Sequence, residues 1–174
     1  MNIRQEILKE HSKSNALKIA AYTITSKKNF KELMQCFMAD EYRLAQRAAW
    51  SVCLVAQKKP AFMKPYLHDL VSQMQRKDVH DSVIRNAVRI LEQITDIPKK
   101  LHGEIMNACF HFIETPTTAV AIKAFSLTTL FNLSKQYPEI KSELKLIIED
   151  RWDTETAAFK SRGKKILAGI EKLK

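Results

Sequence analysis

A basic side chain recurs along this chain at a nearly constant interval. Successive members are separated by 29, 38, 38 and 37 residues. Lysines and arginines placed in this way can bind the phosphates of a polyanion or the carboxylates of an acidic protein. A repeating structural unit must position them, because the residues around each one also repeat. The recurring residues are Lys18, Arg47, Arg85, Lys123 and Lys160.

Helical neighbours enlarge this set. Arg43 precedes Arg47 by one helical turn and Trp50 follows it by nearly one turn, so the three can share a face. Stacked repeats would join such faces into a basic stripe containing one aromatic residue. A tryptophan in an alanine-rich helix is also typical of a core position, and both interpretations stay open. The predicted binding residues are Arg43, Arg47, Trp50, Arg85, Arg89, Lys123, Lys160 and Lys164.

The elements that carry these residues are predicted to be amphipathic helices. Apolar residues recur every three or four positions, as in 44–55 and 83–94, and no segment alternates convincingly with period two. Breaks fall near Pro60, Pro98 and Pro138. We expect first helices of five pairs near 2–10, 28–39, 61–76, 98–114 and 138–152. We expect second helices near 13–26, 41–57, 80–96, 117–136 and 154–172. The predicted N-caps are Asp40, Asp81, Thr115 and Asp153.

Short turns between helices of this length favour antiparallel packing, and one pair of about 38 residues cannot close a core alone. The chain is therefore predicted to form one domain over residues 1–174. Its repeats are expected near 2–27, 28–58, 59–97, 98–136 and 137–174.

The pattern of residues 60–71, a turn containing aspartate, and Ile84-Arg85-Asn86-Ala87 resembles HEAT repeats. The resemblance covers the whole chain and implies an all-α fold, a right-handed α-solenoid of the ARM/HEAT type with about five antiparallel helix pairs. It also implies a ladder in which a turn aspartate pairs with the basic residue seven positions later. The fourth repeat departs from this pattern because it has no carboxylate seven residues before Lys123. The matching pairs are Asp40 with Arg47, Asp78 with Arg85, and Asp153 with Lys160.

The recurring basic residues therefore have two possible roles. As ladder members they would be structural, and removing one partner would leave a desolvated charge. As surface residues they would bind a partner. If the aspartates neutralise them, the expected contacts become the helical neighbours and the paired lysines of the turns between repeats, such as Lys58 and Lys59.

Composition excludes several classes of protein. Glycine occurs only three times, which excludes a glycine-rich phosphate loop, and we expect no cofactor. His68 with Asp69, and Asp78 with His80 and Asp81, lack further ligands at suitable spacing, so no metal site is predicted. Three widely spaced cysteines indicate buried thiols in a reducing compartment. We expect neither a signal peptide nor a membrane span, and predict a cytoplasmic protein.

A net charge of +10 points to an acidic partner without choosing between protein and nucleic acid. Our leading hypothesis is a non-catalytic scaffold that presents a basic curved surface to an acidic protein. The alternative is a DNA-binding protein similar in architecture to the HEAT-like alkylpurine DNA glycosylases. No local motif of those enzymes matches, so an enzymatic role is the less favoured one. The candidate residues on that alternative are Trp50, Asp81, Arg85 and Arg89.

Overall fold

The computed structural model describes residues 1–173, and within them the regular structure is entirely helical. Ten α-helices are accompanied by two 3-10 helices, η1 and η2, and no strand occurs in this range. The all-α fold class expected from the sequence is confirmed. The elements are α1 Ile3–Lys9, α2 Lys13–Thr23, α3 Lys27–Phe37, α4 Tyr42–Lys58, η1 Pro60–Tyr66, α5 Leu67–Gln75, α6 Asp81–Leu91, η2 Lys99–Leu101, α7 His102–Glu114, α8 Val120–Ser134, α9 Ile140–Asp150 and α10 Ala157–Lys172.

The chain divides into two compact units, Met1–Ile94 and Thr95–Lys174. The first unit contains three helix pairs, α1 to α6, and the second contains two, α7 to α10. The boundary lies within three residues of the predicted end of the third repeat at residue 97. That all five pairs act as a single domain stays a prediction.

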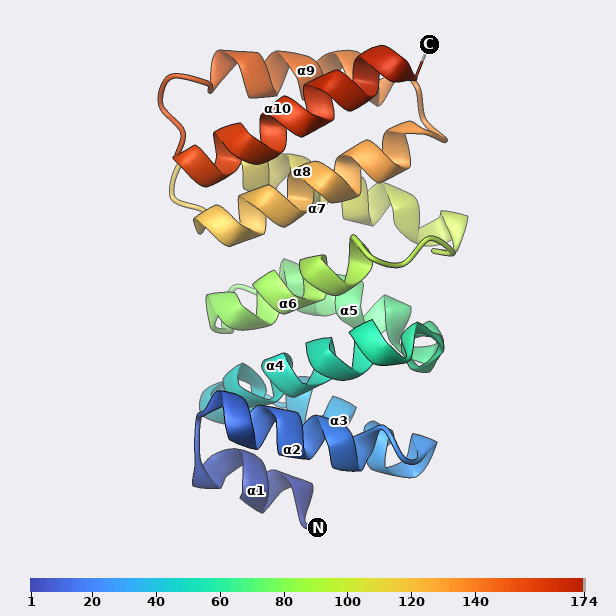
Figure 1. Ribbon diagram of the computed structural model, residues 1–174, viewed down its shortest axis with the longest axis vertical. Coiled ribbons are helices and arrows are strands. Elements are labelled where there is room, and N and C mark those ends of the chain that lie inside the picture. Colours follow the sequence, from blue (N-terminus) through green and yellow to red (C-terminus); the bar gives the residue numbers. More distant parts are fainter. Residues whose placement is uncertain (174) are drawn as a thin grey trace. The chain divides into compact units, whose positions relative to one another are not determined.

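In the Met1–Ile94 unit the second helices of the pairs lie side by side. Helix α4 packs between α2 and α6, with α3 and α5 behind this row (Figure 1). Small residues allow this close approach, since Ala48 and Ala49 of α4 are both 0% exposed. Helix α3 contributes the large core side chains, among them Phe30 and Phe37. Burial of these apolar faces, rather than helix propensity, stabilises the pairs.

The Thr95–Lys174 unit is built in the same way. Helix α8 packs against α7 within its own pair and against α10 of the next pair. Leu127 and Leu130 of α8, with Phe159 and Ile166 of α10, are buried in this core. No helix in residues 1–173 has the length and apolar character needed to cross a bilayer.

The predicted N-cap residues are wrong. Helix α6 begins at Asp81 itself, and the ring nitrogen Nδ1 of His80 accepts a hydrogen bond from the Ser82 amide. Helix α10 is capped by Thr156 rather than Asp153, because turns within residues 151–155 delay the helix. Helix α4 starts after Glu41 and α8 after Ala119, neither with a side-chain cap, so Asp40 and Thr115 lie outside the helices.

The predicted buried thiols are confirmed. Cys36, Cys53 and Cys109 are all buried and free. Burial raises the pKa of the Cys109 thiol to about 12. A thiol that stays protonated at neutral pH is a poor nucleophile and a poor metal ligand. These cysteines therefore serve as small core residues.

Candidate binding surface

The exposed side of α4 carries three of the predicted binding residues. Arg43, Arg47 and Trp50 lie at positions i, i+4 and i+7, while alanines on the opposite side are buried. Arg43 is exposed, whereas Arg47 and Trp50 are half-buried. Trp50 is therefore neither a core residue nor a fully exposed one. Part of its indole ring is therefore accessible to a partner.

Arg47 is held by a neighbouring helix pair. Its Nη1 donates a hydrogen bond of 2.7 Å to the carbonyl oxygen of Leu8, near the end of α1. The carbonyls at a helix C-terminus lack partners within the helix and carry partial negative charge, which favours a guanidinium there. Arg47 thus joins the first and second pairs, by a contact different from the predicted ladder.

Helix α6 presents a second set of charges along one side. Asp81, Arg85 and Arg89 are spaced at i, i+4 and i+8, with Asp81 and Arg85 exposed and Arg89 half-buried. Burial raises the pKa of the Cys53 thiol on α4, and the positive charges of Arg89 and Arg85 act in the opposite direction. Helices α4 and α6 pack against each other, so the exposed sides of both can contribute to one surface.

The aspartates of the predicted ladder bind a different arginine. Arg76 Nη2 donates to Asp40 Oδ1 at 3.0 Å, while Nε and Nη2 donate to the two oxygens of Asp78 at 2.9 and 2.5 Å. Hydrogen bonding to Arg76 lowers the pKa of Asp78. Within residues 1–173, Arg85 has no ion pair with Asp78, and Arg47 has none with Asp40. The expected pairing is therefore wrong for both, because Arg76 lies between the two carboxylates.

The model of the HEAT repeat domain matches residues 3–170, nearly the full length of the chain. The chain belongs to the HEAT repeat family. Family membership confirms the α-solenoid fold class and suggests a scaffold for protein interactions. Comparisons with curated proteins and with solved structures gave no match.

In this HEAT repeat chain Lys123 is buried and does not belong to the predicted exposed basic surface. Its side chain is 3% exposed, and Nζ donates to Glu155 Oε1 at 2.5 Å and to the carbonyl oxygen of Pro116 at 3.2 Å. Its inclusion among the predicted surface residues is corrected for this reason. The two other predicted residues of this unit lie on α10, where Lys160 is half-buried and Lys164 is exposed. Asp153 forms no ion pair with Lys160 in the described range.

Sequence reasoning missed Arg76, which joins two HEAT repeats. Arg76 and Arg151 are the C-cap residues of α5 and α9, the first helices of their pairs, and are 75 residues apart. Arg151 Nη1 donates to the carbonyl oxygen of Glu114, 37 residues earlier, just as Arg76 reaches Asp40 across 36 residues. The sequence signal that could have identified Arg76 is the recurrence of an arginine at the C-terminal ends of α5 and α9.

The predicted turn lysines are partly structural. Lys59 Nζ donates to the carbonyl oxygen of Ile24 at 3.3 Å and lies 5.1 Å from the centre of the Phe62 ring. It therefore joins the first and second HEAT pairs at the end of α2. The part of the chain described by the structure holds no group of three metal-ligating side chains.

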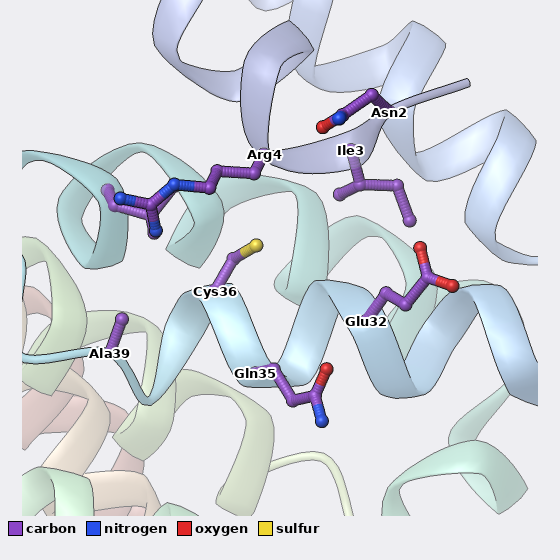
Figure 2. A pocket seen from close by; sticks show the side chains of 8 residues that line it. Asn2, Ile3, Arg4, Glu32, Gln35, Cys36 and Ala39 are labelled. Carbon is purple, nitrogen blue, oxygen red and sulfur yellow. The ribbon is translucent and has the colours of Figure 1, made fainter.

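A cavity of about 380 Å³ lies where α1 meets α3 and the start of α4 (Figure 2). An ion pair between Arg4 and Glu41 lies nearby. Burial raises the pKa of Cys36, so the thiol lining this cavity is not activated. The lining mixes apolar and polar side chains without a cluster suited to catalysis. It comprises Asn2, Ile3, Arg4, Glu32, Gln35, Cys36, Ala39 and Leu44.

Proposed function

We propose that this HEAT repeat protein is a scaffold whose Met1–Ile94 unit binds an acidic segment of a partner protein across α4 and α6. One observation carries the proposal. Arg76 occupies the carboxylates of Asp40 and Asp78, so Arg85 stays exposed without a carboxylate partner in the described residues. Arg43 on α4 is likewise exposed and unpaired there. Exposed guanidiniums bind carboxylates in a bidentate geometry.

The charge of the chain is concentrated in the proposed binding unit. Residues 1–94 contain sixteen lysines and arginines against nine aspartates and glutamates, a net charge of +7. Residues 95–174 contain thirteen against ten, a net charge of +3. An acidic partner would therefore be attracted mainly to the first unit.

Aromatic side chains favour a protein partner over a nucleic acid. Tyr42, at the start of α4, is 52% exposed, and its ring lies 5.7 Å from the ring of His80 at the start of α6. Trp50 follows on the same helix. Protein interfaces are enriched in tyrosine, tryptophan and arginine, and lysine is depleted in them. The α4–α6 surface has this composition.

DNA binding is the second candidate, and the net charge of the first unit supports it. Base excision would require a flipped base in a desolvated pocket, whereas Asp81 and Arg85 are both exposed. We therefore keep DNA binding without excision as the alternative. For the scaffold we propose a cytoplasmic location, whose reducing conditions suit three free thiols.

The experiment compares two ligands by fluorescence anisotropy, a labelled peptide rich in glutamate and aromatic residues and a labelled DNA duplex. We expect the peptide to bind, and the double variant R43E/R85E to weaken it at least about tenfold. The matched control K28E/K31E makes the same charge change on α3 and should retain affinity. Tighter binding of DNA, with log affinity falling linearly against log salt, would replace the protein partner with nucleic acid. Equal affinities for the two double variants would contradict the assigned surface.

A further inference from the structure

A second cavity, of about 420 Å³, lies in the Thr95–Lys174 unit. It opens between the turn that joins α7 to α8 and the turn that joins α9 to α10. These turns bring polar and charged side chains together although they are more than 30 residues apart in the sequence. The cavity is lined by Pro116, Thr118, Val120, Lys123, Arg151, Thr154, Glu155 and Thr156.

The charged residues that line this cavity carry a net positive charge. Glu155 Oε1 accepts from Lys123 Nζ at 2.5 Å and from Arg151 Nη2 and Nε at 2.8 and 3.0 Å. The side chains of Lys123 and Glu155 are only 3% and 5% exposed. One carboxylate therefore faces two cations in a poorly hydrated place, where an excess positive charge is costly unless an anion compensates it.

The lining residues offer no second carboxylate to compensate this charge, since Glu155 is the one acidic residue among them. Seven residues before Lys123 the chain has Pro116, which offers Lys123 only a carbonyl oxygen.

Hydrogen-bond donors border the same space. Helix α8 begins at Val120, and its N-cap residue Ala119 supplies no side-chain cap. The amides of Ile122 and Lys123 donate to the Ala119 carbonyl oxygen, so the available amides are those of Val120 and Ala121. Thr118 lies directly before this start. Thr156 Oγ1 accepts from the Phe159 amide, which leaves its hydroxyl hydrogen available. An ammonium, two hydroxyls and helix N-terminal amides suit a multivalent oxygen anion.

We propose that this cavity binds a phosphate group, as inorganic phosphate or a phosphate monoester, which compensates the excess positive charge of Lys123 and Arg151. Lys123 supplies the positive charge, with Arg151 behind Glu155 holding the site together. Thr118, Thr156 and the first amides of α8 supply hydrogen bonds. The site is independent of the α4–α6 surface, so either proposal can fail alone.

The experiment measures the melting temperature of the full chain in increasing phosphate at constant ionic strength. Binding to the folded state raises the melting temperature progressively with ligand concentration. P116D places a carboxylate in the cavity lining near Lys123, so we expect a smaller phosphate response than in the wild type. P116A removes the proline without adding charge and should respond like the wild type. Equal responses of P116D and wild type would reveal a general salt effect and overturn the proposal.

A direct measurement covers the case in which P116D folds poorly. We expect ³¹P line broadening of inorganic phosphate and of phosphoserine by the wild-type chain, and several-fold weaker binding by T118V, which keeps the charge of the site. R85E should broaden the line as the wild type does. Broadening by phosphoserine alone would identify a monoester site, and broadening by inorganic phosphate would identify the free ion as a ligand. Displacement by acetate at equal concentration, or no broadening at all, would overturn the phosphate assignment.

Discussion

Arg76 Nη2 lies 3.0 Å from Asp40 Oδ1, although the two residues are 36 positions apart. The same guanidinium binds Asp78, two residues away. A single arginine thus joins the turn after α3 to the turn after α5. Both carboxylates are exposed, which places the expected energy of each pair in the range of surface salt bridges.

The first prediction contrasts Arg76 with Arg85. R76A should lower the free energy of unfolding by about 1 kcal/mol, because it removes two carboxylate partners and a link between pairs. R85A should change it by less than about 0.5 kcal/mol, as expected of an exposed residue without a partner. Urea unfolding followed by circular dichroism measures both. A larger loss of unfolding free energy in R85A than in R76A would support the predicted pairing of Asp78 with Arg85.

The second prediction concerns Glu155. E155Q should lower the free energy of unfolding by roughly 3 kcal/mol, since it leaves Lys123 and Arg151 without their buried countercharge. The surface variant E149Q, whose partner Lys145 is half exposed, serves as control and should cost well under 1 kcal/mol.

The contribution of Glu155 to stability should also depend on pH. Burial tends to raise the pKa of Glu155, but hydrogen bonds from Lys123 and Arg151 outweigh it and lower the pKa below the ordinary value of 4.5. The stabilisation is therefore complete above pH 4.5 and is lost as the pH falls through the lowered pKa of the folded state. The stability difference between wild type and E155Q should shrink on acidification below pH 4.5. A difference that stays constant down to pH 2 would contradict this assignment.

The third prediction uses two glycines in helices. A Cβ atom at Gly169 would lie 2.6 Å from Cζ of Phe131, whereas one at Gly103 would meet nothing within 4 Å. G169A should therefore destabilise the α8–α10 contact, and G103A should stabilise α7 by about 0.5 kcal/mol through reduced backbone entropy of the unfolded chain. Thermal unfolding tests both. The double variant F131L/G169A should recover part of the loss, and its failure to do so would exclude the clash as the cause.

The fourth prediction concerns the start of α10. T156A should cost about 1 kcal/mol, because the Thr156 hydroxyl oxygen accepts from the Phe159 amide. D153A should cost almost nothing, because Asp153 is exposed and lies four residues before the helix. Circular dichroism during thermal unfolding distinguishes the two variants. A larger loss of stability in D153A than in T156A would show that Asp153 is the N-cap of α10.

The helix pairs could be predicted because their signals are local. Apolar spacing identified each helix core, and Pro60 and Pro138 follow closely the ends of α4 and α8. Helix α6 ends at Leu91, seven residues before Pro98, so that proline did not mark its end. Helix starts were less predictable, since several polar residues compete to cap the same turn and the winner depends on backbone geometry. His80 shows the difficulty, because histidine is not a favoured cap and yet accepts from the Ser82 amide.

The candidate sites were predictable only in part, because several of their contacts join residues that are far apart in the sequence. The spacing of seven residues between Asp78 and Arg85 suggested a pair, but Arg76 approaches Asp78 more directly. Asp40 finds its partner in the following helix pair, where sequence spacing gives no guide. Lys123 matches the other recurring cations in sequence, and only the fold reveals that Glu155 covers it.

Within each unit, the polar contacts between neighbouring helix pairs join residues separated by about one repeat. The separation is 39 residues for Arg47 and Leu8, 35 for Lys59 and Ile24, and 32 for Lys123 and Glu155. Such contacts close short loops, which favours rapid folding from several starting points along the chain. Damage should also stay local: loss of the Lys123–Glu155 contact should speed amide hydrogen exchange in α8 and α10 while leaving α2 protected.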